Sequence, residues 1–278
     1  MAKLASMPFL LAAAPLSAVA EDTLTPMSPA LQVTSHPYMV LGVAPGNAKL
    51  EAAETLTEYF DRNLEDEVVT LNVQSSNGRT FRLEYAQRLV SPWVTPLVRM
   101  GSDPYEEVNV SLATDVLDGR VLGVERVIVA TGTDRPSAGS VFKQIEDAFG
   151  TPSLQHFDNY ESEMIYAHAG GILVRDLKAA DPNPSAAGVG SSDYLSDGAP
   201  CKTAIGRSPI YKFRSPREGD WIGTCDLVFR ITVQNSVANT TIRFSLIDYA
   251  LTRANRDETD RQINETLQET APASEIKL

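Results

Sequence analysis

Side chains that commonly do chemistry are few in this sequence. The 278 residues contain three histidines, His36, His156 and His168, and two cysteines, Cys201 and Cys225. His36 lies in an extended stretch before a proline, His156 follows a helical segment in a polar loop, and His168 alternates with apolar residues on a strand. These positions favour solvated or structural imidazoles over a catalytic base.

The sequence lacks the motifs of several enzyme classes. No serine lies in a G-x-S-x-G context, and the glycines at 188–190 lack the third glycine and the lysine of a phosphate-binding loop. No short His/Cys spacing suits zinc, and the segment 181–192 has Ala186 and Ser192 where a calcium loop needs Gly and Glu. We therefore predict no catalytic, cofactor-binding or metal-binding residue.

The densest carboxylate cluster comprises Asp61, Glu65, Asp66 and Glu67. A glycosidase needs two carboxyl groups about 5 to 10 Å apart across a cleft. This cluster instead marks the end of a helical pattern and the start of a strand, where charges are typically solvated. An acid-type hydrolase therefore stays an alternative function and not the leading one.

The segment between the two cysteines is basic although the protein is acidic. Cys201 and Cys225 are 24 positions apart and are expected to form a disulfide in an oxidising compartment. Arginine and aromatic side chains are enriched at protein interfaces because they bury large areas and offer directional hydrogen bonds. The candidate interface residues are Tyr211, Phe213, Arg214, Arg217 and Trp221. Alternatively, the aromatic rings fill the local core and the charges are solvated.

The first 20 residues have the pattern of a signal peptide. Lys3 precedes an apolar stretch at 7–14, and Ala18-Val19-Ala20 provides a small-x-small cleavage site. The apolar stretch is about eight residues long, whereas a membrane-spanning helix needs about 20. We predict an exported protein of the periplasm or extracellular space, without a stable membrane anchor.

Charge narrows the possible partners. The formal net charge is −12, and the isoelectric point is about 4.7. A surface this acidic repels phosphate backbones, so the sequence predicts no nucleic-acid binding.

Periodicity predicts a repeated order of elements. Apolar residues at helical spacing over 48–61 are followed by four segments that alternate with period two, and the same order returns after a helical segment at 136–149. We predict an α+β fold of two tandem units, each a helix packed on a four-stranded antiparallel sheet. The predicted divisions are the signal peptide 1–20, an extended lead-in 21–37, a first unit 38–133, a second unit 134–250 with a mobile loop 179–200, and a loosely docked charged helix and tail 251–278.

Two short motifs carry a resemblance to a known family. Gly42-Val43-x-x-Gly46-Asn47 opens the first helix, and Phe149-Gly150-Thr151-Pro152 closes the second. These turns resemble those of small bacterial envelope proteins of the SmpA/OmlA type, whose fold is similar to that of the tandem-repeat β-lactamase inhibitor proteins. The motifs cover less than a tenth of the chain. The resemblance implies a non-catalytic module that binds other proteins, and the sequence departs from it in lacking a lipidated cysteine.

Taken together, these features predict an exported, non-enzymatic protein that binds another envelope or extracellular protein. One alternative is a periplasmic small-molecule or glycan-binding protein, which needs a pocket with convergent polar groups between the two halves. The other alternative is the acid-type hydrolase, which needs two facing carboxyls.

Overall fold

In both halves of the described chain a helix precedes the strands, as predicted, but the second half has five strands and not four. The computed structural model describes residues 22–27, 36–75, 78–91, 105–133, 135–175, 177, 198–213 and 222–269. The elements are α1 (Lys49–Phe60), β1 (Glu65–Gln74), β2 (Thr80–Val90), β3 (Tyr105–Leu112), the 3₁₀ turn η2 (Asp115–Leu117), β4 (Val121–Thr131), α2 (Ala138–Phe149), β5 (Leu154–His156), β6 (Glu161–Ala169), β7 (Ile172–Leu173), β8 (Cys225–Asn235), β9 (Asn239–Asp248) and α3 (Tyr249–Glu269). The signal peptide 1–20 and most of the loop 179–200 lie outside the described residues.

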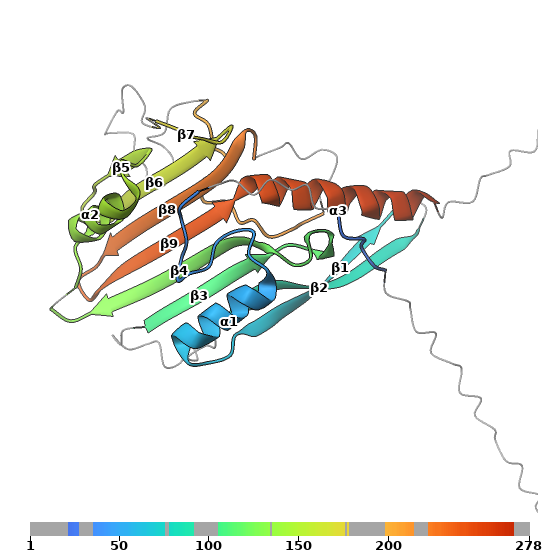
Figure 1. The fold of residues 1–278 in the computed structure, drawn as a ribbon, viewed down its shortest axis with the longest axis horizontal. Coiled ribbons are helices and arrows are strands. Elements are labelled where there is room, and N and C mark those ends of the chain that lie inside the picture. Colours follow the sequence, from blue (N-terminus) through green and yellow to red (C-terminus); the bar gives the residue numbers. More distant parts are fainter. Residues whose placement is uncertain are drawn as a thin grey trace, which may run out of the picture.

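The prediction of two separate four-stranded sheets is wrong, because the strands form one antiparallel sheet. Its order is β1-β2-β3-β4-β9-β8-β6-β5, with β7 paired to β6 (Figure 1). The junction is the β4–β9 ladder, which runs from Gly123 opposite Ile247 to Thr131 opposite Asn239. Each predicted unit ends in a long strand, β4 or β9, which would be an edge strand with unpaired backbone N–H and C=O groups if the sheets were separate. In the structure, these two strands form hydrogen bonds with each other. Alternation along a strand reveals its faces but not its neighbour, so the pattern left this pairing unspecified.

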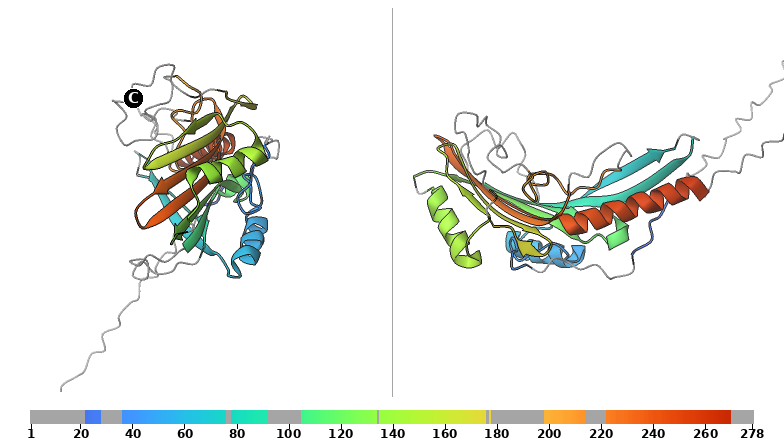
Figure 2. Two further views of the ribbon diagram at one scale, coloured as in Figure 1. Left: turned by 90° about the vertical axis from the view of Figure 1, so that its left-hand side faces the viewer. Right: turned by 90° about the horizontal axis from the view of Figure 1, so that it is seen from above.

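The sheet is bowed, and its two faces are covered differently. In Figure 2 (right), α1 and α2 lie on the convex side, whereas the segment 198–213 lies on the concave side. Both helices therefore cover the same face of the one sheet. Antiparallel sheets commonly bury one face and leave the other more polar, and the concave side contains the polar residues described below.

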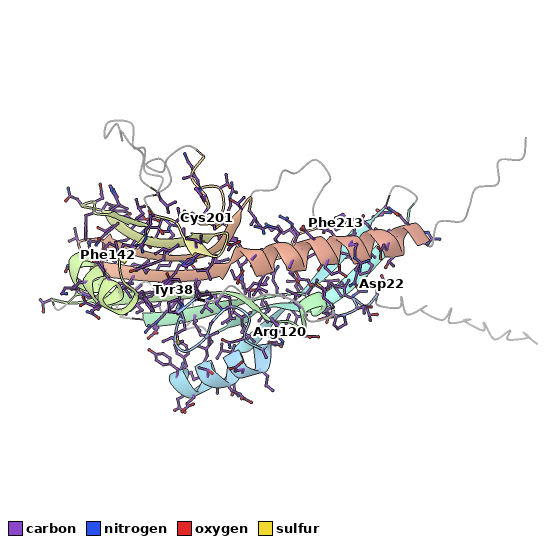
Figure 3. All side chains as sticks on the ribbon, turned by 45° about the horizontal axis from the view of Figure 1, so that its top comes forward. Asp22, Tyr38, Arg120, Phe142, Cys201 and Phe213 are labelled. Carbon is purple, nitrogen blue, oxygen red and sulfur yellow. A yellow bond between two sulfur atoms is a disulfide. The ribbon has the colours of Figure 1, made fainter. Side chains whose placement is uncertain are left out.

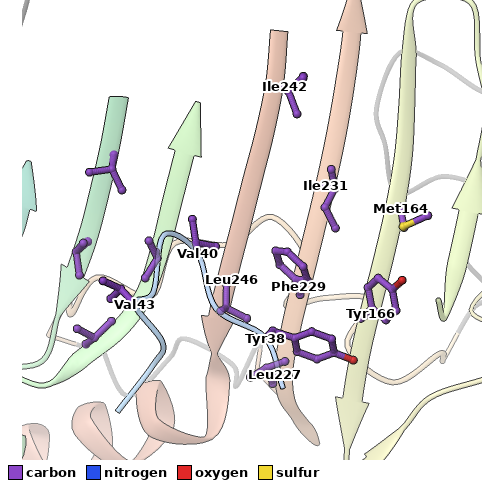
Figure 4. Packing of buried hydrophobic residues seen from close by; sticks show 14 of the residues in the cluster. Tyr38, Val40, Val43, Met164, Tyr166, Leu227, Phe229, Ile231, Ile242 and Leu246 are labelled. Atoms are coloured by element: carbon purple, nitrogen blue, oxygen red, sulfur yellow. The ribbon is translucent and has the colours of Figure 1, made fainter. Parts of the chain in front are cut away.

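The convex-side core is built around aromatic rings. Tyr38 is buried, and its ring centroid lies 5.2 Å from Phe149, 5.3 Å from Tyr166 and 5.4 Å from Phe229. Figure 4 shows Tyr38 lying over β8 and β6 beside Phe229 and Tyr166. Offset and edge-on ring pairs at these separations add about 0.5–1.5 kcal/mol beyond area burial. The segment before α1 thus closes this core.

The C-terminal helix α3 is firmly docked, contrary to the sequence-based expectation. Leu251, Ile263 and Leu267 are buried in a cluster that includes residues of the β1–β2 hairpin. In addition, Asn255 Oδ1 accepts from the Thr114 amide at 3.0 Å and from the Thr114 hydroxyl at 2.9 Å. Buried polar groups that satisfy one another cost little, so a count of apolar residues alone underestimated this contact. In the described part of the chain, no helix is both long and apolar enough to span a membrane.

Candidate functional site

A polar hollow of about 270 Å³ opens on the concave side, across the β4–β9 junction. Strands β2, β3, β4, β9 and β8 form its floor, and residues 206–209 form one wall. The lining residues are Arg88, Asn109, Ser111, Gly123, Val124, Glu125, Gly206, Arg207, Ser208, Pro209, Arg230, Thr232, Arg243, Ser245 and Ile247. Because both halves of the chain contribute strands, the site exists only in the joined sheet.

The strand register explains why these polar side chains converge. Asn109 lies opposite Glu125, Glu125 opposite Ser245, and Ser245 opposite Arg230. Residues directly opposite in an antiparallel pair point to the same face, and their Cβ atoms are about 4.5–5.5 Å apart. One continuous row of polar residues therefore crosses four strands.

Small residues beside this row create the hollow. A Cβ atom at Gly123 would lie 2.9 Å from the Leu246 carbonyl oxygen, closer than side chains approach in proteins. Glycine is thus required for the close passage of β4 along β9. Ser111 lies opposite Gly123, so two adjacent strands present almost no side-chain volume at this point.

Three of the four lining arginines lie against carboxylates. Arg88 contacts Glu67 at 3.0 Å, and Arg243 pairs with Glu125 across the β4–β9 junction. Arg230 donates to Glu163 and lies 3.7 Å from Glu161. The Arg230–Glu163 pair is the buried one of the three, whereas the pairs of Arg88 and Arg243 are partly exposed to solvent.

The segment 198–213, which contains the wall residues 206–209, is held in place by a disulfide and by Tyr249. Cys201 and Cys225 are joined as predicted, which ties the segment to the start of β8. The buried Tyr249 hydroxyl, at the start of α3, donates to the Arg207 carbonyl at 2.9 Å. Arg207 is consequently held at the rim by covalent and hydrogen-bonded contacts. A disulfide is consistent with an oxidising compartment.

Removal of the disulfide should loosen this wall and lower stability. For a loop of 24 residues, the chain-entropy estimate predicts that Cys201→Ser with Cys225→Ser lowers the free energy of unfolding by about 3 kcal/mol. Urea unfolding of the double variant and of the oxidised and reduced wild-type protein measures the effect. Equal stability of the oxidised and reduced wild-type protein would contradict this prediction.

Glu163 is the most perturbed carboxylate next to the hollow. Its side chain is 1% exposed, and within the described residues its Oε2 atom has no hydrogen-bond partner. Burial raises the pKa of Glu163 to about 7, Arg230 opposes this shift, and the neighbouring Glu161 adds to it. Near neutral pH this carboxyl is therefore partly protonated, and Arg230 is only partly neutralised by it.

Stability should fall as the pH rises through the pKa of Glu163. Between its unfolded pKa near 4.5 and its folded pKa of about 7, the folded state binds more protons than the unfolded state. Relative to Glu163→Gln, the wild-type protein should lose about 2–3 kcal/mol of unfolding free energy between pH 5 and pH 8. Urea titrations of both proteins at the two pH values measure this difference, and parallel pH profiles would contradict the prediction.

The predicted interface residues are only partly within the described chain. Tyr211 is 5% exposed, and its hydroxyl donates to Asp260 Oδ1 of α3 at 2.6 Å. Phe213 is partly buried and packs against the hydrophobic cluster that contains Leu251 and Ile263 of α3 (Figure 3). Both rings therefore belong to the local core. Arg214, Arg217 and Trp221 lie outside the described residues.

The structure brings two of the histidines together. His168 is 8% exposed, its Nε2 lies 3.1 Å from the Tyr38 hydroxyl, and burial lowers its pKa. His36 accepts from the Tyr38 amide through Nδ1 and stacks on the Tyr38 ring. This arrangement fits the structural role that the sequence favours for His168. His156 lies on the edge strand β5.

The acidic cluster at 61–67 is a charged surface with ion-pair partners. Lys49 lies 2.6 Å from Asp66, and Arg88 holds Glu67. Asp61 and Glu65 are exposed. Within the described ranges, no group of three His, Cys, Asp or Glu side chains is placed to hold a metal ion.

Sequence inspection missed the floor of the hollow. Arg230 interrupts the apolar strand Leu227–Val233, and Arg243 and Ser245 alternate with apolar residues on β9. A charged residue in the middle of a buried strand is an informative departure from pattern. Arg230 is visible in the sequence as an exception to the pattern, but which polar residues lie beside it depends on the strand order.

Comparison of the chain with protein-family models, with curated proteins and with solved structures found no match.

Proposed function

We propose that this chain is an exported, non-catalytic binding protein that docks another protein on the concave face of its sheet. The observation that carries the proposal is the arginine-lined hollow at the centre of this face, across the β4–β9 junction. Arginine anchors in central, well-packed positions contribute much of the energy of protein interfaces.

The size of the hollow favours an anchoring side chain over a whole small molecule. Pockets that enclose drug-sized ligands usually measure about 300–1,000 Å³ and are mainly apolar. This hollow is about 270 Å³, and its floor consists mostly of charged and hydroxyl-bearing side chains. A small-molecule or glycan-binding protein is the second candidate, because polar groups from both halves do converge there.

The lining gives little support to hydrolysis. Glu125 is the one carboxylate among the described residues that line the hollow, and it is engaged by Arg243. Acid-type glycoside hydrolysis needs two carboxyls that face each other across the substrate. Binding without turnover is therefore the better-supported function.

Two sequence features support export. The predicted signal peptide provides the route, and the Cys201–Cys225 disulfide is stable in oxidising compartments. The resemblance to envelope proteins of the SmpA/OmlA type implies the same class of protein-binding function.

Affinity capture with charge-reversed variants tests the proposal. The chain from residue 21 onward, immobilised as the wild type and as Arg207→Glu, is exposed to envelope and extracellular extracts of the source organism. Arg62→Glu serves as the matched control, because Arg62 is an exposed arginine two residues after the end of α1, a helix that lies on the convex side. Recovered proteins are purified and titrated against each variant.

We expect a purified partner to bind the wild type and Arg62→Glu equally and Arg207→Glu at least tenfold more weakly, a difference of about 1.4 kcal/mol. Partners that bind all three proteins equally, or the absence of any direct binder, would contradict docking on this face.

A further inference from the structure

Arg207 differs from the other arginines of the hollow in its surroundings. It is exposed at the rim, and across the described ranges no carboxylate is within ion-pair distance of its guanidinium group. Arg88, Arg230 and Arg243 each contact a carboxylate. As far as the described residues go, the planar guanidinium of Arg207 is therefore available to bind an anion at the edge of the hollow.

The backbone of the rim brings this cation close to the floor. Gly206 has a φ of 78°, and a Cβ atom at this position would lie 3.4 Å from the Arg230 side chain. Glycine is favoured here because it adopts a positive φ without strain, and the 3.4 Å separation places the rim in ordinary contact distance of the Arg230 side chain. Arg207, the next residue, lines the same hollow as Arg230.

Neutral hydrogen-bond donors line the same hollow as Arg207. The hollow is lined by the hydroxyls of Ser111 and Ser245 and by the amide of Asn109, and none of these has a side-chain partner within the described chain. Serine hydroxyls and the Asn amide donate hydrogen bonds to a carboxylate without adding charge. One cation with neutral donors is therefore available for an incoming group.

The charge balance selects a single negative charge. When Glu163 is protonated, each floor arginine still contacts one other carboxylate, namely Glu67, Glu125 or Glu161, so among the described residues that line the hollow only Arg207 has no carboxylate partner. A phosphate group carries about −1.5 to −2 charges and would lie next to Glu125 in an acidic protein. A carboxylate carries one charge and matches the planar guanidinium fork.

From these contacts we infer that the hollow is a binding site for one carboxylate group, supplied by a glutamate, aspartate or C-terminus of the docked protein. Arg207 holds the carboxylate, and Ser111, Ser245 and Asn109 donate to its oxygens. This inference rests on the proposed docking function and specifies the chemistry of the anchor group.

Calorimetric titration of the chain from residue 21 onward at pH 6 tests the inference. The probes are the peptide acetyl-Ala-Ala-Glu-Ala-Ala-amide, its Gln counterpart, acetate and inorganic phosphate. We expect the Glu peptide to bind at least tenfold more tightly than the Gln peptide and more tightly than acetate. Amide NMR signals of Ser111 and Ser245 should shift on binding.

Matched variants locate the effect. Arg207→Gln should weaken binding of the Glu peptide about tenfold or more, because a charged hydrogen-bond pair is lost. Arg62→Gln should leave it unchanged. Arg207 is exposed, so neither substitution removes core contacts. Equal binding of the Glu and Gln peptides, or no effect of Arg207→Gln, would overturn the inference.

The remaining outcomes separate the inference from the docking function. Phosphate binding more tightly than acetate, or acetate binding as tightly as the Glu peptide, would overturn a protein-borne carboxylate as the ligand. Loss of a captured partner in Arg207→Glu without any affinity for the Glu peptide would leave docking in place and refute the carboxylate site. Tight binding of the Glu peptide without any protein partner would support the site and refute docking.

Discussion

Replacement of Phe229 by alanine should lower the free energy of unfolding by about 3–5 kcal/mol, the range for loss of a large ring from a core. Phe229 is buried in the middle of β8, and its ring packs against Tyr38, Phe149 and Tyr166. The substitution removes this contact area and leaves a cavity that a sheet paired on both sides cannot collapse. Urea unfolding followed by circular dichroism measures the loss.

Tyr160→Ala is the control for this substitution. Its side chain is 59% exposed, and it precedes β6 without joining the aromatic core. We expect a change within about 0.5 kcal/mol, which is usual for surface positions. Equal effects of the two alanine substitutions would show that the core is not centred on Phe229.

Replacement of Arg230 by leucine should cost about 3–5 kcal/mol at pH 8, because the ionised Glu163 is then buried without its partner. The penalty should shrink at pH 5, where Glu163 is protonated in the folded state. Unfolding in urea at both pH values measures the change.

A double variant isolates the charge effect. In Glu163→Gln with Arg230→Leu, no buried carboxylate remains next to position 230, so the cost of Arg230→Leu should fall to about 1–2 kcal/mol at pH 8. A full penalty in the Glu163→Gln background would mean that Arg230 stabilises the fold by packing and not through Glu163.

Local periodicity predicted most elements but not their assembly. The helix expected at 48–61 is observed at Lys49–Phe60, and the one expected at 136–149 is observed at Ala138–Phe149. The spacing of apolar residues differs between a helix and a strand with one buried face. Each segment therefore reveals its own type of element without reference to the rest of the chain. The β4–β9 junction depends on a match between two strand edges more than a hundred residues apart, which spacing within a segment does not encode.

The candidate site illustrates the same limit. Cys201 and Cys225 were found because a covalent bond needs only two residues of one type. The floor of the hollow draws Asn109, Glu125, Ser245 and Arg230 from four strands, and their convergence follows from register alone. The aromatic loop residue Tyr211 was considered for an interface by its type, whereas its burial against α3 is a property of the tertiary fold.

Hydrogen exchange at the β4–β9 junction tests most directly whether the two halves form one sheet, on which the hollow depends. β4 pairs with β3 on one side and β9 on the other from Gly123 to Val129, so consecutive amides from Val124 to Val129 should all exchange slowly. In an edge strand, every second amide points away from its one neighbour and exchanges fast. NMR exchange rates with uniform protection along Val124–Val129 are the predicted result. Fast exchange at alternate residues of this stretch would contradict the joined sheet and the binding site built on it.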